Sequence, residues 1–278
     1  MTVTPIARRS VLFVSAMMHS DLEPALTSGA DIVCIDLEDA VPLDQKRKAR
    51  AALIALKLSA HATVQIIIRI NSLRSLEGLA DIQACLMEMS RIGGILLPKV
   101  ETGDEIRWAG SLVEEAKVDI DLYGIIETPD GLENCRHIAC AHQRLKALFF
   151  GGFDLSTALG SAMDWESLLF ARSRVVHAAA CAGIESLDSP FPDIADQPGL
   201  RSAAERAKAL GMVGKAAKHV SQIPLIREVF TPTSDEIEHA RHILRRFRAN
   251  PAKPLIDAGK LIELPTIKRL ERIARVEI

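Results

Sequence analysis

Short apolar runs alternate along the chain with longer stretches whose apolar residues recur at helical spacing. The run at 64–70 is almost wholly apolar and β-branched, which is typical of a strand buried on both faces of a parallel sheet. We expect eight strands, at 11–15, 32–38, 64–70, 94–98, 122–127, 148–154, 184–187 and 212–216. Between them we expect helices at about 20–28, 43–58, 75–89, 131–142, 166–182 and 197–210.

Eight strand–helix units within about 230 residues predict an α/β fold with a parallel sheet. This number suits a (β/α)₈ TIM barrel better than an open doubly wound sheet, which remains the alternative. After residue 230 the pattern changes. A helix capped by Thr233 or Ser234 runs to about 248, and prolines then break it. We therefore expect a barrel over 1–230 and a C-terminal helical extension or lid over 231–278.

Composition excludes several classes of function. The formal net charge is -2 and aromatic residues make up 4% of the chain, so neither a basic footprint nor a base-stacking surface for nucleic acid is expected. No apolar run approaches the roughly 20 residues of a membrane span. The five cysteines are odd in number and lack C-x-x-C spacing, which favours reduced thiols in a cytoplasmic protein.

Polar residues collect where the expected strands end, which is where TIM barrels carry their active sites. They form a ring of charges at one end of an apolar barrel. In chain order they are Asp36, Glu38, Asp39, Arg69, Asn71, Lys99, Glu127, Asp154, Asp188, Lys215 and His219. Because buried charges cost several kcal/mol each unless they are paired or bind a ligand, the whole ring indicates a functional site.

Glu127 and Asp154 end two successive strands that one crossover joins, so we expect them to lie side by side. Two such carboxylates can share one cation, and oxygen ligands favour Mg²⁺ or alternatively Mn²⁺. The alternative is that each carboxylate only caps the helix that follows. Gly151 and Gly152 either admit close approach of the backbone to a ligand or form a tight turn.

Arg69 is the expected anion clamp, because its guanidinium can hold a substrate carboxylate with two hydrogen bonds. A structural salt bridge to Glu38 or Asp39 is the alternative. Lys99 is a candidate for binding a substrate carboxylate or phosphate, with a buried ion pair as the other interpretation. Glu38 and Asp39 are expected to support the site by orienting Arg69 or the metal's waters.

Seven motifs resemble the citrate lyase β-subunit-like branch of the HpcH/HpaI aldolase family, and the resemblance runs from about residue 8 to the C-terminus. They occur in the family's order, at residues 9–14, 36–41, 69–71, 97–100, 126–129, 150–155 and 230–233. The resemblance implies a Mg²⁺-dependent (β/α)₈ carbon–carbon lyase that acts on a 3-hydroxyacyl-CoA such as malyl-CoA, citramalyl-CoA or a citryl thioester. It also implies a homotrimer or hexamer, with the C-terminal extension packing on a neighbouring subunit.

The same resemblance implies roles for individual residues. Glu127 and Asp154 correspond to the metal ligands, and Arg69 to the clamp for the substrate carboxylate. Glu127 is further implied to contact substrate. Glu263 occupies the position from which relatives reach a neighbouring subunit's site with an aspartate acid/base, although its side chain is longer.

A second departure lies near the eighth expected strand. The family usually has Gly-Lys-x-x-Ile-His-Pro there, and this chain has Lys218 in place of the apolar residue and Val220 in place of the proline.

Other functions fit the same residues. A thioesterase on the same CoA substrates, or an enzyme that runs the condensation in the synthetic direction, would use the same site residues and give different products. A CoA-independent 2-oxo-acid aldolase is disfavoured by the block at 36–41 and by the long C-terminal tail. The altered strand-eight motif and Glu263 motivate a non-catalytic ligand-binding barrel. A subunit of a multienzyme citrate lyase is a further alternative.

Overall fold

The computed structural model describes residues 7–55, 64–87, 89, 92–250 and 255–274. The ends of the helices expected at 43–58 and 75–89 reach residues outside these ranges. The chain divides into two compact units, residues 1–230 and residues 231–278, which are described separately below.

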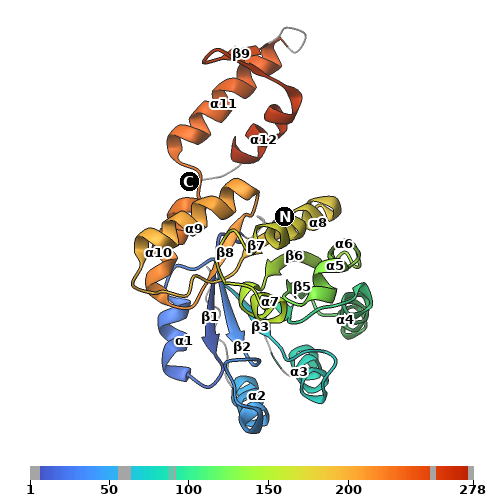
Figure 1. Ribbon diagram of the computed structural model, residues 1–278. Coiled ribbons are helices and arrows are strands. Elements are labelled where there is room, and N and C mark those ends of the chain that lie inside the picture. Colours follow the sequence, from blue (N-terminus) through green and yellow to red (C-terminus); the bar gives the residue numbers. More distant parts are fainter. Residues whose placement is uncertain (1–6, 56–63, 88, 90–91, 251–254, 275–278) are drawn as a thin grey trace. The chain divides into compact units, whose positions relative to one another are not determined.

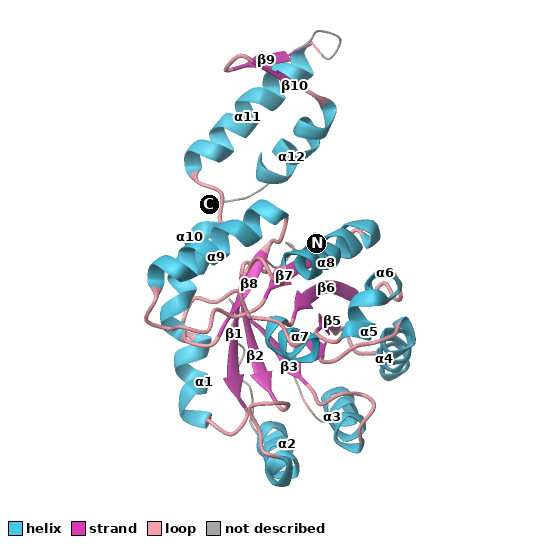
Figure 2. Ribbon diagram, in the orientation of Figure 1, coloured by secondary structure: helices cyan, strands magenta, loops and turns pink. Residues whose placement is uncertain are grey.

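The first unit is a closed barrel of eight parallel strands paired in chain order, with β1 against β8 (Figure 1). This confirms the predicted TIM barrel. The strands are β1 (Ser10–Ser15), β2 (Ile32–Asp36), β3 (Gln65–Arg69), β4 (Gly94–Leu97), β5 (Asp121–Ile126), β6 (Leu145–Phe150), β7 (Glu185–Asp188) and β8 (Gly214–Ala217). Helices surround the strands, as Figure 2 shows.

The barrel helices are α1 (His19–Leu26), α2 (Lys46–Ala55), α3 (Leu76–Met87), α4 (Gly103–Ala116), α5 (Pro129–Glu133), α6 (Cys135–Ala139), α7 (Gly152–Leu159), α8 (Leu169–Ala182), α9 (Gln197–Leu210) and α10 (Ile223–Phe230). The prediction of a single crossover helix at 131–142 is wrong, because two short helices, α5 and α6, meet at Asn134. The last strand of the barrel begins two residues later than expected.

Alternation along the strands separates two apolar layers. Cys34, Ile67 and Phe149 belong to a cluster built from alternate strand residues, which is the barrel interior. Their neighbours Val33 and Ile68 belong to the larger cluster between strands and helices. Because side chains alternate with a period of two, the next inward positions are fixed once the interior residues are known.

The second unit contains α11 (Ser234–Ala249), the hairpin of β9 (Leu255–Asp257) and β10 (Lys260–Ile262), and α12 (Leu264–Ala274). Thr233, not Ser234, caps α11, and Glu236 completes a capping box. The two helices pack through a small core that includes Ile243 and Leu270. The hairpin turns through Ala258 and Gly259, both with positive φ.

Candidate functional site

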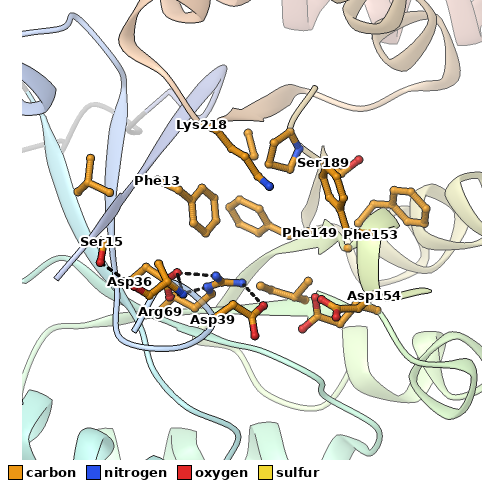
Figure 3. A pocket seen from close by; sticks show the side chains of 18 residues that line it. Phe13, Ser15, Asp36, Asp39, Arg69, Phe149, Phe153, Asp154, Ser189 and Lys218 are labelled. Atoms are coloured by element: carbon orange, nitrogen blue, oxygen red, sulfur yellow. Dashed lines mark hydrogen bonds and ion pairs between the residues drawn. The ribbon is translucent and has the colours of Figure 1, made fainter. Parts of the chain in front are cut away.

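The inward positions of the strands end in a pocket of about 410 Å³ at the carboxyl end of the barrel (Figure 3). Asp36, Arg69 and Glu127 each lie two residues beyond an interior apolar residue of the same strand, so alternation points them into the barrel mouth. The pocket is lined by Phe13, Val14, Ser15, Asp36, Asp39, Ala40, Arg69, Ile125, Glu127, Phe149, Phe150, Gly151, Phe153, Asp154, Ser189, Pro190, Ala216 and Lys218.

Arg69 lines this pocket, but its guanidinium is already engaged. Nε donates to Asp36 Oδ1 at 2.8 Å and Nη2 to Asp36 Oδ2 at 2.5 Å, while Nη1 lies 3.0 Å from Glu38. Burial lowers the pKa of Arg69, but the hydrogen bonds and charge of Asp36 outweigh burial and the net shift is upward. The salt-bridge alternative for Arg69 is therefore present in the structure. Its main partner, Asp36, was noted in the sequence but given no role.

Lys99 is held by a left-handed backbone, with φ of 51°. This conformation is costly for a residue with a side chain, and such strain is typical of functional sites. The Lys99 N–H donates to Glu127 Oε1 at 2.8 Å, while its ammonium pairs with Glu38 and lies 3.3 Å from Asp39. Lys99 does not line the pocket. The structure therefore shows the ion pair, and Lys99 also orients Glu127.

Glu127 follows β5 directly and is 3% exposed. Burial and the charges of Glu38 and Asp154 raise its pKa to about 8, and the opposing effects of Arg69 and the Lys99 N–H are smaller. Asp154 lines the same pocket from the first turn of α7, and not from the end of β6 as the sequence suggested. A buried carboxyl group beside other negative charges is the environment in which a cation is most favoured.

Gly151 leaves room for Glu127. A Cβ atom at position 151 would lie 2.3 Å from Glu127 Cβ and 2.6 Å from Glu127 Oε2. The φ of Gly151 is -97°, which any residue can adopt, so the requirement is for space and not for backbone freedom. Of the two interpretations given above, close approach applies here, and the group approached is the Glu127 side chain.

Two members of the expected ring of charges face outward. Asp188 and Lys215 alternate with the inward residues Leu187 and Ala216, so they lie on the outer face of the barrel. There Asp188 pairs with Lys215 and accepts a hydrogen bond from Arg172 Nε at 3.0 Å. The expectation that they belong to the same ring as Glu127 is wrong, because the two weakest strands had no pattern that fixed which residues face inward.

Glu263 lies in the second unit, between β10 and α12, and is exposed.

Within the described ranges no three His, Cys, Asp or Glu residues cluster as a complete metal site. Two carboxylates suffice for Mg²⁺, which usually keeps several waters and takes other ligands from substrate. The described helices include none long and apolar enough to cross a membrane.

Sequence reasoning missed most of the pocket wall. Phe13, Phe149 and Phe153 supply aromatic faces, and Ser189 and Lys218 line the side opposite Asp36 and Arg69 (Figure 3). The strand parity that identifies Phe13 and Phe149 was available in the sequence. Ser189 and Lys218 lie just beyond the ends of β7 and β8. The inward and outward alternation of strand residues predicts their direction only if it continues past the strand.

The sequence model of the HpcH/HpaI aldolase/citrate lyase family matches residues 9–220. The chain belongs to this family. Its family membership confirms the resemblance drawn from the seven motifs and makes the protein a member of a lyase family. The barrel and pocket described above are therefore those of an HpcH/HpaI family protein.

Individual HpcH/HpaI relatives match over nearly the whole chain. The L-malyl-CoA/beta-methylmalyl-CoA lyase of Rhodobacter capsulatus is 31% identical, covering 96% of this chain and 93% of its own. The mitochondrial citramalyl-CoA lyase of Mus musculus is 28% identical, covering 96% and 85%.

The chain is also similar to solved structures over most of its length. The protein CitE of Mycobacterium tuberculosis, in complex with magnesium, acetoacetate and coenzyme A, is 26% identical with a TM-score of 0.81, covering 97% of both chains. RipC of Yersinia pestis is 37% identical with a TM-score of 0.71, covering 82% of this chain and 97% of its own.

Proposed function

We propose that this protein is a Mg²⁺-dependent carbon–carbon lyase. It cleaves a 3-hydroxyacyl-CoA of the malyl-CoA, citramalyl-CoA or citryl thioester type into an acyl-CoA and a 2-oxo acid. The single observation that carries the proposal is the pairing of buried Glu127 with Asp154 in one pocket of a barrel whose relatives include malyl-CoA and citramalyl-CoA lyases.

Glu127 and Asp154 are the residues that would hold Mg²⁺. The pocket fits a cation because the pKa of Glu127 is raised to about 8 by burial and by neighbouring carboxylates, and a cation relieves that penalty. The Lys99 N–H fixes Glu127 Oε1, and Gly151 leaves space beside Oε2. When bound, Mg²⁺ supplies Lewis-acid stabilisation of the charge that develops on the substrate oxygen.

Arg69 orients the substrate in this proposal. Asp36 accepts hydrogen bonds from Nε and Nη2, and Nη1 lies 3.0 Å from Glu38, so the guanidinium is locked in place and its second Nη2 hydrogen is the donor assigned to the substrate carboxylate. A rigid Arg69 places the substrate carboxylate without the entropy cost of ordering a free side chain. The faces of Phe13, Phe149 and Phe153 shield the reacting carbons from bulk water, which favours cleavage over thioester hydrolysis.

Glu263 of a neighbouring subunit is the proposed acid/base, in a homotrimer or hexamer. Its exposure in the second unit leaves the carboxylate available to another copy of the chain. In cleavage, one group removes the hydroxyl proton as the carbon–carbon bond breaks, and an acid then protonates the α-carbon of the departing acyl-CoA.

Product analysis tests the proposal. Purified protein is incubated with malyl-CoA and with citramalyl-CoA, with and without Mg²⁺, while free thiol and 2-oxo acid are both followed. We expect metal-dependent 2-oxo acid together with intact acetyl-CoA. Free CoA without 2-oxo acid would instead establish a thioesterase and overturn the proposal.

A further inference from the structure

The Arg69 side of the pocket carries an excess of negative charge. Five carboxylates gather there against three cations. The carboxylates are Asp36, Glu38, Asp39, Glu127 and Asp154, and the cations are Arg69, Lys99 and the buried Lys46. With every carboxylate ionised, a divalent metal would offset the two excess charges. This side alone would then have no net positive charge to attract a carboxylate-bearing substrate.

Lys218 is the other cation that lines the pocket. It follows β8 by one residue and shares the inward side with Ala216. Its ammonium lies 4.2 Å from the centroid of the Phe153 ring, and Figure 3 shows it on the side of the pocket opposite Arg69 and Asp39. Among the residues that the structure describes, no carboxylate lies within 4.0 Å of the Lys218 ammonium.

The two lining cations therefore differ in what they can offer a ligand. Arg69 has Asp36, Glu38 and Asp39 around it. Lys218 rests only on an aromatic face, and cation–π contact leaves the donors of an ammonium free for an anion. Lys218 thus supplies the charge that the rest of the pocket lacks.

We propose that the Lys218 ammonium binds a carboxylate of the 2-oxo acid half of the substrate, and that it makes the pocket selective for acyl groups that carry this carboxylate. The inference rests on the proposed function for the division of the substrate into two halves. It makes Lys218 a substrate-binding residue in addition to Arg69.

Condensation in the synthetic direction separates the two halves, because acetyl-CoA and a 2-oxo acid are then independent substrates. KM for each is measured with saturating Mg²⁺, using pyruvate, glyoxylate and oxaloacetate in turn. The proteins compared are wild type, Lys218→Met, Lys218→Arg and the matched control Lys48→Met, whose lysine is exposed on α2. Calorimetric titration of pyruvate and oxaloacetate into the Mg²⁺-loaded proteins gives a readout that does not need turnover.

Lys218→Met is expected to raise KM for at least one 2-oxo acid, and its Kd, by about tenfold or more, which is the loss of one charge-assisted hydrogen bond. KM for acetyl-CoA should stay within about twofold. Lys218→Arg should recover most of the loss, and Lys48→Met should match wild type. A rise in KM for acetyl-CoA alone would assign Lys218 to the CoA phosphates and overturn the inference, as would no change in either.

Failure of the proposed function is seen separately. A wild type that neither cleaves nor condenses but binds pyruvate or oxaloacetate refutes the lyase, while the effect of Lys218→Met on Kd still decides the role of Lys218. A wild type that binds no 2-oxo acid overturns the inference about Lys218.

Discussion

An inner and an outer ionic cluster at the carboxyl end of this barrel differ in the face of the strands that carries them. The outer cluster of Arg172, Asp188 and Lys215 is buried, with Asp188 0% and Lys215 2% exposed, and Arg172 and Lys215 border a cavity of about 250 Å³. The inner cluster around Asp36 and Arg69 opens into a pocket. A shift of one residue along a strand thus separates charges packed on the outer face of the barrel from charges that line the pocket.

The two clusters also differ in charge balance. Outside, one carboxylate holds two cations, and burial lowers the pKa of Lys215 more than Asp188 raises it. Lys215 and Arg172 keep the pKa of Asp188 below its usual range although burial opposes this. Inside, carboxylates exceed cations and the pKa of Glu127 rises to about 8. The outer cluster has one cation more than it has carboxylates, and the buried Arg172 Nη1 has no hydrogen-bond partner among the described residues, whereas the inner cluster has more carboxylates than cations.

Asp188→Ala should have the largest effect, and on stability. It leaves Arg172 and Lys215 buried without their shared carboxylate, which typically costs about 3–5 kcal/mol. Urea unfolding monitored by circular dichroism measures the loss. A change below about 1 kcal/mol would show that the outer cluster does not stabilise the fold.

Gly151→Ala should mainly damage activity. The new Cβ would meet Glu127 Cβ and Oε2, so the carboxylate must move away from its position beside Asp154. We expect kcat/KM to fall by about 10- to 100-fold, as for a misplacement of roughly 1 Å in a catalytic group. Gly160→Ala is a control for replacing a glycine, because it has open space, although its positive φ costs some stability. Wild-type activity in Gly151→Ala would contradict this account of the site.

Mg²⁺ binding should depend on pH through Glu127. Its pKa of about 8 in the metal-free protein means that Mg²⁺ must displace a proton at neutral pH. Between about pH 8 and pH 6 the apparent Kd should weaken by up to about tenfold per unit, and about one proton should be released per ion near pH 7. Titration calorimetry in two buffers of different ionisation enthalpy measures both. An affinity for Mg²⁺ that is independent of pH, with no proton released, would contradict the raised pKa of Glu127.

The raised pKa of Glu127 also makes the stability of the metal-free protein depend on pH. The folded Glu127 holds its proton up to about pH 8, whereas the unfolded carboxyl loses it near about pH 4.3. The contribution of Glu127 to folding therefore declines as the pH rises through this window, and Mg²⁺ should restore the lost stability. Thermal unfolding at several pH values, with and without Mg²⁺, measures whether stability falls as the pH rises and whether Mg²⁺ restores it.

Asp39→Asn should have the smallest effect on stability. The Asp39 side chain is 53% exposed, and it lies 3.3 Å from Lys99 and 3.6 Å from Arg69. Solvent screens such a pair, so the expected change in unfolding free energy is below about 1 kcal/mol. Asp36→Asn, which disrupts the buried two-point contact to Arg69, should cost clearly more. Equal costs for the two variants would contradict the distinction between exposed and buried members of the inner cluster.

The sequence predicts the barrel because the strands from β1 to β6 contain clear apolar runs. The same runs predict that Asp36, Arg69 and Glu127 lie at one end, since each follows the apolar residues of its own strand. The assignment of Asp188 and Lys215 failed where the strands are short and mixed. β7 reads Glu-Ser-Leu-Asp and β8 reads Gly-Lys-Ala-Ala, and neither shows which residue faces inward.

The remaining errors have a different physical origin. Asp154 and Lys218 reach the pocket from beyond the ends of their strands, where the backbone direction depends on the following turn. The pairing of Arg69 with Asp36 follows from strand register, because Asp36 on β2 lies directly beside Arg69 on β3. Sequence reasoning identified both strands but did not align them, so it named Glu38 and Asp39, which do lie 3.0 and 3.6 Å from Arg69, and missed Asp36.

The most direct test of the central claim compares wild type with Glu127→Gln, which keeps the shape of the side chain and removes its charge. Cleavage of malyl-CoA and citramalyl-CoA is measured across a Mg²⁺ titration, with the unfolding free energy measured on the same samples. The account predicts that Glu127→Gln loses at least about a hundredfold in kcat/KM and weakens Mg²⁺ binding, while its metal-free stability at about pH 8 is equal to or above that of wild type. Wild-type turnover with an unchanged Mg²⁺ requirement would contradict it.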